Sequence, residues 1–303
     1  MNTISFSPSN FVMQSIIAEL APPGRAVKII RASHLGMCFG VRDAINLALD
    51  ESSRQPLTIL GELVHNESVI SDLRARGVAI EAQAAAVQTP AVMITAHGAS
   101  EKTLALARSH GLQVLQATCP LVHFAHRAVQ QLVREGFHPV IIGQRGHVEV
   151  RGLTEDLSEL DVVLTEEDVR QLAERPRFGV AAQTTQPVDK VRRLLEAIRQ
   201  RFPLSELRYA DTVCQPTKQR QTSAQQLARE SDVVVVVGGA HSNNTRELAA
   251  TCRRHCASVH HVQGAEDLQA EWFAGAATVG ITAGTSTPDD IIDAVENWLQ
   301  TNL

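Results

Sequence analysis

From about residue 27 onward, short apolar runs alternate along the chain with longer amphipathic stretches. The apolar runs predict β-strands over residues 28–32, 57–60, 92–95, 114–118, 139–143, 161–165, 178–182, 232–238 and 277–283. Stretches such as 41–51 and 188–202 carry apolar residues at helical spacing. This alternation is typical of α/β structure built on parallel sheets.

Three of these strands lead directly into a cysteine at the start of a predicted helix, namely Cys38, Cys119 and Cys214. A strand further along each unit ends in a polar or glycine-rich turn, with the sequences GELVHN, GQRGHVEV and GGAHSNN. These turns place His65, His147 and Ser242 at 27, 28 and 28 positions after the cysteines. Second polar turns (TAHGAS, AAQTTQP and TAGTSTP) follow 32, 37 and 44 positions later, at His97, Thr184 and Ser286.

The matched spacings predict three similar parallel-sheet α/β domains with little literal sequence identity. We expect an N-terminal extension over 1–26, a first domain over 27–118, a second over 119–210, and a third with a C-terminal tail over 211–303. The first strand of the first domain is available to pair with the third. Because ligands bind beyond the carboxyl ends of parallel strands, packing around a pseudo-threefold axis would direct all these turns to one centre.

Three thiolates that converge on one point suit an iron–sulfur cluster. A fully ligated 4Fe–4S cluster takes four protein ligands, so three cysteines leave one iron open to substrate. Any one of these cysteines alone would more often be a buried apolar residue, but their threefold placement argues against that interpretation for the set. Cys252 and Cys256 lie one helical turn apart, outside the repeated position, and we interpret them as structural.

The polar turns suit a phosphate-like anion, because turns of Gly, Ser, Thr and Asn before helices expose backbone N–H groups. His65, His97 and His147 could add imidazole donors, although a single histidine in such a place is more often structural. The serines and asparagines could equally be helix N-caps. Glu149, two residues after His147, could deliver a proton to a leaving hydroxyl with Thr184 as relay; the plainer alternative is a surface glutamate.

Composition limits the classes of function. The chain has 303 residues, of which 44% are hydrophobic and 20% charged, and its net charge of −5 offers no basic surface for nucleic acid or acidic lipid. No run approaches the roughly 18–20 apolar residues that cross a bilayer. The N-terminus shows no secretory pattern and the cysteine count is odd, so we expect a cytoplasmic protein without a disulfide framework.

Nine motifs, in order along the chain, resemble those of the 4-hydroxy-3-methylbut-2-enyl diphosphate reductases. This is the IspH or LytB family of the methylerythritol phosphate route to isoprenoids. The motifs are GMCFGVRDAI, GELVHN, TAHG, ATCPLV, GHVEV, QTT, TVC followed by RQ, HSNN and TAGTSTPD. The resemblance runs from about residue 27 to the C-terminus. Each motif alone is weak, but nine in the same order are highly specific.

The resemblance implies a cloverleaf of three α/β domains around a central 4Fe–4S cluster held by Cys38, Cys119 and Cys214. It implies a diphosphate site formed by His65, His97, His147, Ser242, Asn243, Asn244 and Ser286. Glu149 would be the proton source and Thr184 its partner near the substrate hydroxyl. The implied reaction reduces an allylic diphosphate to isopentenyl and dimethylallyl diphosphates, with electrons from ferredoxin or flavodoxin.

The sequence departs from the family pattern at Gln116, where Asp is usual, and at Pro216, where Ala is usual; the serine pair of the third turn reads Ser242–Asn243. None of these changes removes a ligand or the acid, but they leave open an altered substrate range. Two other functions also suit three cysteines on this scaffold. One is a quinolinate-synthase-like enzyme with a Lewis-acid iron, and the other is a non-catalytic cluster sensor or anion-binding module.

Overall fold

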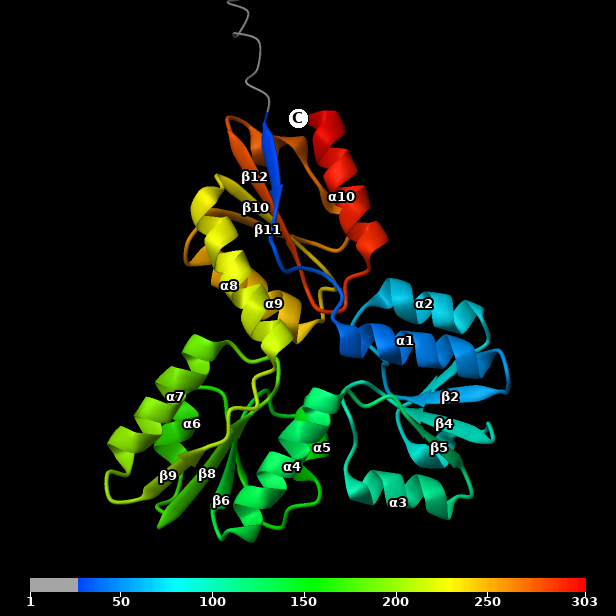
Figure 1. The fold of residues 1–303 in the computed structure, drawn as a ribbon, viewed down its shortest axis with the longest axis vertical. Helices are drawn as coiled ribbons and strands as arrows, with labels where there is room; N and C mark the ends of the chain where they lie inside the picture. The colour runs from blue at the N-terminus through cyan, green and yellow to red at the C-terminus, as the bar shows by residue number, and fades with distance from the viewer. Residues whose placement is uncertain (1–26) are drawn as a thin grey trace, which may run out of the picture.

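The structure is a computed structural model that describes residues 27–303, so the expected extension over residues 1–26 lies outside the described part. The described residues form three lobes around a common centre, each built on a parallel sheet of four strands (Figure 1). The predicted fold class is therefore confirmed. Among residues 27–303, no helix is long and apolar enough to span a bilayer.

Lobe 1 contains the sheet with strand order β3-β2-β4-β5. Its strands are β2 (Leu57–Leu60), β3 (Ala79–Glu81), β4 (Ala91–Ile94) and β5 (Gln113–Gln116). Its helices are α1 (Phe39–Ser52), α2 (Glu67–Ala75) and α3 (Glu101–Ser109), with a short 3₁₀ turn at Ala84–Ala86. The buried faces of α1 and α2 pack on β2 and β4 and exclude water from this core.

Lobe 2 repeats this order as β7-β6-β8-β9. Its strands are β6 (His138–Ile142), β7 (Asp161–Val163), β8 (Arg177–Ala182) and β9 (Glu206–Tyr209). Its helices are α4 (Pro120–Arg134), α5 (Val148–Thr154), α6 (Glu166–Gln171) and α7 (Val188–Arg201). Helices α4 and α5 cover one face of the sheet, whereas α6 and α7 cover the other.

Lobe 3 has the order β11-β10-β12-β1 and takes its last strand from the beginning of the described chain. Its strands are β1 (Lys28–Arg31), β10 (Val233–Val237), β11 (Ser258–Val262) and β12 (Thr278–Ala283). Its helices are α8 (Gln215–Glu230), α9 (Asn243–Arg253) and α10 (Asp289–Asn302), with 3₁₀ turns at Ala265–Asp267 and Ala270–Phe273. Strand β10, five valines, is fully buried because helices cover both faces of the sheet.

The first strand of the described chain belongs to the third sheet by its hydrogen bonding. Lys28 aligns with Thr278 and Arg31 with Ile281, in parallel register. Each lobe thus has the same strand order, and in each case the fourth strand leads into the first helix of the next lobe. The expected domain boundaries at 118/119 and 210/211 stay a prediction, but the strand pairing places β1 apart from the rest of the first segment.

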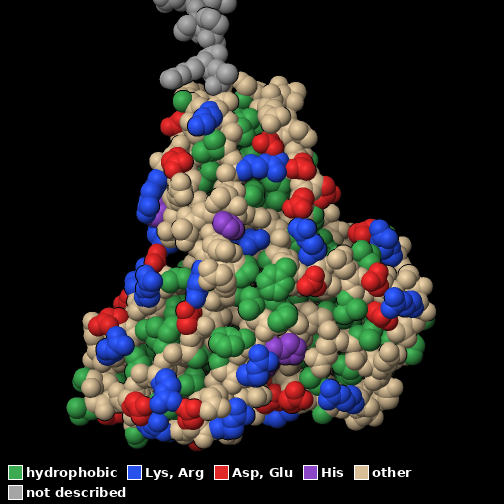
Figure 2. All heavy atoms as spheres, in the orientation of Figure 1, with side chains coloured by type: hydrophobic (Ala, Val, Ile, Leu, Met, Phe, Trp, Pro, Cys, Tyr) green, Lys and Arg blue, Asp and Glu red, His purple; other side chains and the backbone are tan. Residues whose placement is uncertain are grey.

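All nine strands expected from the sequence are present, while β3, β9 and β11 were not expected. Helices over 41–51 and 188–202 are confirmed as parts of α1 and α7. On the face shown in Figure 2, acidic and basic side chains are interspersed over all three lobes, with apolar side chains exposed between them.

Candidate functional site

Each cysteine predicted as a ligand is the residue immediately before a helix, with Cys38 before α1, Cys119 before α4 and Cys214 before α8. The main-chain N–H of each donates to a carbonyl oxygen in the turn after β12, β4 or β8. The acceptors are Thr285, Ala96 and Thr184, at 3.1, 3.1 and 3.0 Å. The three cysteines are therefore anchored in the same way, at the three points where the chain passes between lobes.

The three thiols share one central region. A Cβ atom on Gly40 would lie 2.5 Å from the Sγ atom of Cys119, so the start of α1 requires glycine there. Burial raises the pKa of Cys119, and the charges of Cys38 and Glu149 raise it further. Burial also raises the pKa of Cys214 to about 11, with the same two charges contributing. Three thiolates are stable together here only beside positive charge, which a metal centre would supply.

One positive charge near the thiols was missed from the sequence. Arg220 on α8 is only 8% exposed and donates hydrogen bonds to the carbonyl oxygens of Gly36, at 3.0 Å, and Pro216, at 3.1 Å. Burial lowers its pKa, while the charges of Cys38 and Cys214 raise it. The sequence signal for it is the RQ pair in the helix that follows the third cysteine, which by itself does not indicate a buried charge.

The donor chemistry of three thiols is that of an iron–sulfur cluster. Within residues 27–303, no group of three or more His, Cys, Asp or Glu side chains is arranged to hold one metal ion. Cysteine ligands of an iron–sulfur cluster bind different irons and stand further apart than the ligands of a single ion. All three thiols are partly exposed and none forms a disulfide. Their chemistry and placement therefore fit the iron–sulfur cluster expected from the sequence.

Three imidazoles meet beside this region. The ring centroids of His65, His97 and His147 are 4.7, 5.2 and 5.7 Å apart. Burial lowers the pKa of His97 well below its usual value, and burial lowers that of His147 to about 4; neighbouring positive charges add to both shifts. The Nε2 atom of His65 is buried without a partner among the described residues. An anion between the rings would supply that partner and would reverse the shifts.

Lobe 3 contributes the turn that faces these histidines. Ser242 is the N-cap of α9, so the capping role considered for it is present. Asn244 accepts the N–H of Thr285 at 2.9 Å, and the hydroxyl of Ser286 donates to the carbonyl oxygen of His65 at 3.2 Å. The side-chain nitrogen of Asn243 is buried and has no partner in the described part of the chain. Unused donors from lobes 1 and 3 thus lie at one place, as an anion site requires.

Glu149 is a buried carboxyl group, not a surface glutamate, being 1% exposed. Its carboxylate accepts the N–H of Thr184 at 2.6 Å and the hydroxyl of Thr184 at 3.0 Å. Burial raises the pKa of Glu149 to about 7, against the lowering effect of these two hydrogen bonds. The N–H of Glu149 donates to Nδ1 of His147 at 3.1 Å, which leaves the ring proton on Nε2.

A small cavity of about 40 Å³ lies among these groups. Its lining includes His65, His97, His147, Glu149, Ser242, Asn243, Asn244 and Ser286, together with Thr185, which the sequence interpretation did not single out. Thr184 does not line the cavity but is hydrogen-bonded to Glu149, which does. Cys38, Cys119 and Cys214 are not among the lining residues. The space suits one or two water molecules, so a diphosphate would require the surrounding side chains to move apart.

The remaining two cysteines lie away from this centre. Cys252 and Cys256 are 0% and 7% exposed and belong to the hydrophobic core between α8, α9 and β10. Burial raises the pKa of Cys252 to about 12. Their position matches the structural interpretation made from the sequence.

Comparisons with known proteins agree with this architecture. A family model described as LytB protein matches residues 29–300. The 4-hydroxy-3-methylbut-2-enyl diphosphate reductase of Aquifex aeolicus is 38% identical over 281 residues, covering 90% of this chain and 96% of the relative. The enzyme of the same name from Trichlorobacter lovleyi is 35% identical, covering 90% of this chain and 98% of the relative.

Two solved structures are also similar. The E-1-hydroxy-2-methyl-but-2-enyl-4-diphosphate reductase from Plasmodium falciparum superposes with a TM-score of 0.83 at 25% identity, covering 89% of this chain and 87% of that one. A structure of (E)-4-hydroxy-3-methyl-but-2-enyl diphosphate reductase, described as the terminal enzyme of the non-mevalonate pathway, gives a TM-score of 0.66 at 37% identity. That match covers 91% of this chain and 99% of the other.

Proposed function

The chain belongs to the LytB family of 4-hydroxy-3-methylbut-2-enyl diphosphate reductases, and from this membership we propose the reaction that its central site carries out. The reaction is the reductive dehydroxylation of 4-hydroxy-3-methylbut-2-enyl diphosphate to isopentenyl and dimethylallyl diphosphates. It consumes two electrons and two protons for each substrate molecule and releases one water molecule. Ferredoxin or flavodoxin supplies the electrons, and the enzyme works in the cytoplasm.

Cys38, Cys119 and Cys214 hold a 4Fe–4S cluster in this proposal. The observation that carries it is the identical anchoring of these three residues at the three passages between lobes. When bound, the cluster supplies the electrons and a Lewis-acidic iron that no side chain provides. The Arg220 guanidinium offsets part of the negative charge that collects there.

The diphosphate binds among His65, His97, His147, Ser242, Asn243, Asn244 and Ser286. Support comes from the unpartnered nitrogen atoms of His65 and Asn243 and from the clustering of the three imidazoles. In the free protein, burial keeps the pKa of His97 and of His147 low. The negatively charged diphosphate would stabilise the protonated imidazole rings, so its binding takes up protons near neutral pH.

Glu149 holds the proton that the leaving hydroxyl receives. A carboxyl group with a pKa of about 7 is a much better donor near neutral pH than an ordinary glutamate, most of which is ionised there. Thr184, in the turn after β8, fixes the carboxyl through two hydrogen bonds. Glu149 and Thr184 are both buried, which excludes bulk water. Water there would lower the pKa of Glu149 and could take up its proton in place of the substrate.

The test is anaerobic. Protein purified without oxygen should contain about four irons and four sulfides per chain and should oxidise reduced viologen only when the allylic diphosphate is added. Both five-carbon diphosphates should appear in proportion to the electrons consumed. A Lewis-acid lyase would change the substrate without using electrons, and a sensor would bind it without change, so either result would replace the proposal.

A further inference from the structure

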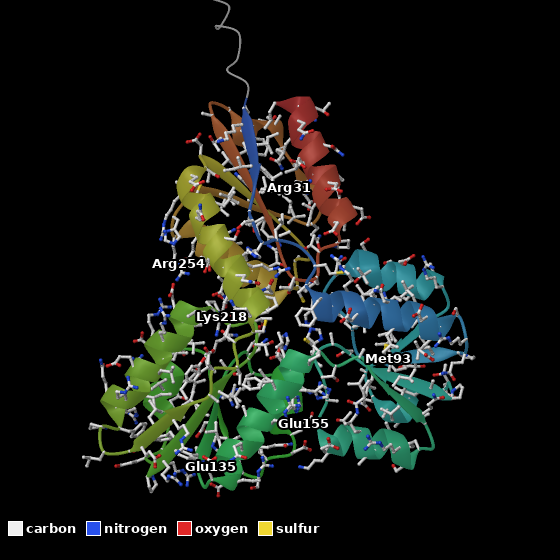
Figure 3. The ribbon with its side chains drawn as sticks, in the orientation of Figure 1. Arg31, Met93, Glu135, Glu155, Lys218 and Arg254 are labelled. Atoms are coloured by element: carbon white, nitrogen blue, oxygen red, sulfur yellow. The ribbon has the colours of Figure 1, made fainter. Side chains whose placement is uncertain are left out.

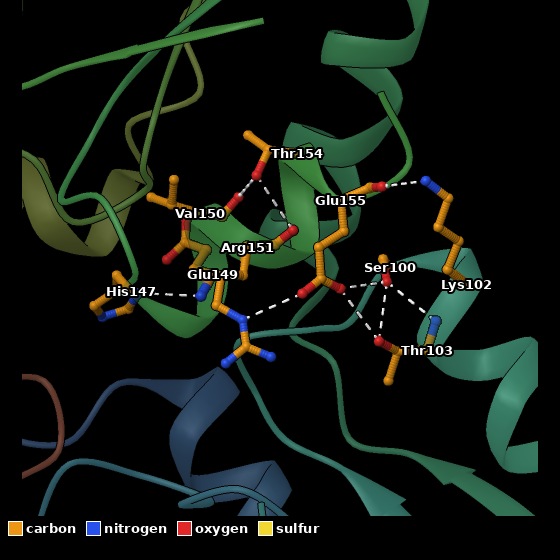
Figure 4. Close-up of polar contacts among 9 residues, drawn as sticks. All are labelled: Ser100, Lys102, Thr103, His147, Glu149, Val150, Arg151, Thr154 and Glu155. Atoms are coloured by element: carbon orange, nitrogen blue, oxygen red, sulfur yellow. Dashed lines mark hydrogen bonds and ion pairs between the residues drawn. The ribbon is translucent and has the colours of Figure 1, made fainter. Parts of the chain in front are cut away.

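Helix α5 carries site residues at one end and interlobe contacts at the other. His147 and Glu149 lie at its N-terminal end, in the central site. Glu155 and Asp156 follow its C-terminal end and both bond to lobe 1. Figure 4 shows the contacts of Glu155. Figure 3 places Glu155 beside α5, where the lobes of α3 and α4 approach each other. The two ends are about 9 Å apart along the helix axis, from six residues at 1.5 Å each.

Asp156 satisfies free backbone groups of a helix that belongs to the other lobe. Its carboxylate oxygens accept the N–H groups of Glu101, at 2.7 Å, and of Lys102, at 3.0 Å, in the first turn of α3. The first N–H groups of a helix have no partner within it, and a negative charge there also interacts favourably with the helix dipole. Asp156 therefore caps α3 from lobe 2.

Glu155 extends the same interface. One carboxylate oxygen accepts the hydroxyls of Ser100, at 2.7 Å, and Thr103, at 3.3 Å, while the other accepts Nε of Arg151 at 3.2 Å. The ammonium group of Lys102 donates to the main-chain carbonyl oxygen of Glu155 at 2.6 Å. Figure 4 shows Ser100, Lys102 and Thr103 all directed toward Glu155.

The lobe 1 side of this interface also leads into the central site. Ser100 is the N-cap of α3 and stands three residues after His97 in the same turn. The turn touches α5, since a Cβ atom on Gly152 would lie 3.5 Å from the Cα atom of Ala99. The His97 and His147 rings, one from each side, have centroids 5.7 Å apart. Each side of the interface therefore carries a histidine of the central site close to it in sequence: His97 in lobe 1 and His147 in lobe 2.

We propose that Glu155 and Asp156 form an interlobe latch that positions His147 and Glu149 relative to His97. The inference rests on the proposed function and names positioning residues for it, since neither carboxylate lines the cavity. Helix α5 has only seven residues, and its apolar contacts are made by Val150 and Leu153 on one side. Without the latch, the C-terminal end of the helix keeps only its apolar packing and the approach of Gly152 to Ala99, and a shift of the helix moves His147 and Glu149 together.

The experiment uses the full-length holoenzyme with variants at both latch positions. In Glu155→Ala and Asp156→Ala we expect the affinity for inorganic diphosphate, measured by calorimetry, to fall about five- to tenfold, a range typical of one lost capping interaction. The kcat for the allylic diphosphate should fall in parallel, because the same helix carries the acid. Glu155→Gln keeps an oxygen acceptor for Ser100 and should restore most of both values.

Glu101→Gln is the matched control, because it removes one negative charge from the N-terminal end of α3, and among residues 27–303 only the backbone of Glu101, not its side chain, bonds to lobe 2. It should leave diphosphate affinity and kcat unchanged. Cluster absorption and melting temperature of each variant separate positioning from loss of fold. Wild-type values of affinity and kcat in the double variant Glu155→Ala/Asp156→Ala would overturn the latch. A wild-type enzyme without substrate-dependent electron uptake would overturn the proposed function instead.

Discussion

The five cysteines of the chain fall into two sets that differ both in position and in burial. Cys38, Cys119 and Cys214 precede helices at the passages between lobes and face a shared centre. Cys252 and Cys256 lie within one lobe and pack among apolar side chains. The residue type is the same, so the position after the carboxyl end of a parallel strand, and not the thiol itself, distinguishes the cysteines proposed as cluster ligands from those in the core.

Replacement of a central cysteine should give the largest effect. Cys38→Ser, Cys119→Ser and Cys214→Ser each remove one ligand from a set of three, so the cluster should be lost or unstable in each. We expect no measurable turnover and at most a fraction of the wild-type iron content. Iron analysis and visible absorption of anaerobic preparations provide the measurement. A serine variant with full iron content and turnover would break the distinction between the two sets.

Glu149→Gln tests whether the centre faced by Cys38, Cys119 and Cys214 is catalytic and not only structural. The amide cannot donate an acidic proton, so kcat should fall about 10²- to 10³-fold, the range of a lost general acid. Cluster absorption and the affinity for inorganic diphosphate should stay near the wild-type values. Thr184→Val is a useful companion, since it removes the hydroxyl that holds the carboxyl while leaving the acid. Unchanged turnover in Glu149→Gln would exclude this residue as the acid.

The pH dependence of kcat/KM should report the same carboxyl in the free enzyme. Burial raises the pKa of Glu149 to about 7, so the group is protonated, and able to donate, below that pH. Above pH 7 the protonated fraction falls about tenfold per unit, and kcat/KM should fall with it. Initial rates at substrate concentrations well below KM between pH 6 and 9 give the profile. A flat profile over that range would place the proton donor elsewhere.

A cysteine-to-serine substitution at Cys252, in the core of lobe 3, should have a small effect on stability and none on the cluster. Cys252→Ser places a hydroxyl in an apolar core, where the nearest acceptor, the carbonyl oxygen of Ala224, is 3.9 Å from the sulfur. The expected cost is about 1–3 kcal/mol of unfolding free energy, with iron content and kcat unchanged. Denaturant titration measures the unfolding free energy, iron analysis the iron content and the viologen assay kcat.

Cys256→Ser should be milder still. Its sulfur lies 3.3 Å from the carbonyl oxygen of Ser258 and 3.4 Å from that of Ser231, so a hydroxyl there finds acceptors. We expect a change below about 1 kcal/mol. A loss of cluster in either of these variants would show that the two sets are coupled through lobe 3.

The sequence predicted the buried strands but not the polar edge strands. The missed strands β3, β9 and β11 each stand at a sheet edge, where one side is open and the apolar pattern is weak. Edge strand β1 was expected because its apolar residues are packed against α10. The edge strands β5 and β7 were expected as well, so the apolar content of a strand, and not its place in the sheet, decides whether the pattern predicts it.

Residue patterns predicted which turns meet, but not how closely they are packed. The triple repeat predicted that three cysteines and the histidine turns meet at one centre, and in the structure the histidine turns line one cavity. It did not predict the burial of Glu149, which depends on Thr184 from another segment. Nor did it indicate Arg220 or the contacts of Glu155 and Asp156, because single charged residues on helices have no periodic signal.

The pairing of β1 with β12 has a consequence for how the protein is made. Residues 28–31 leave the ribosome early, but their partners at 278–281 follow some 250 residues later, which takes about 12–50 s at ordinary translation rates. Lobes 1 and 2 can fold in that interval, while the earliest strand waits without its neighbour. Cys38 is therefore the first of its group to be synthesised and the last to be fixed in place.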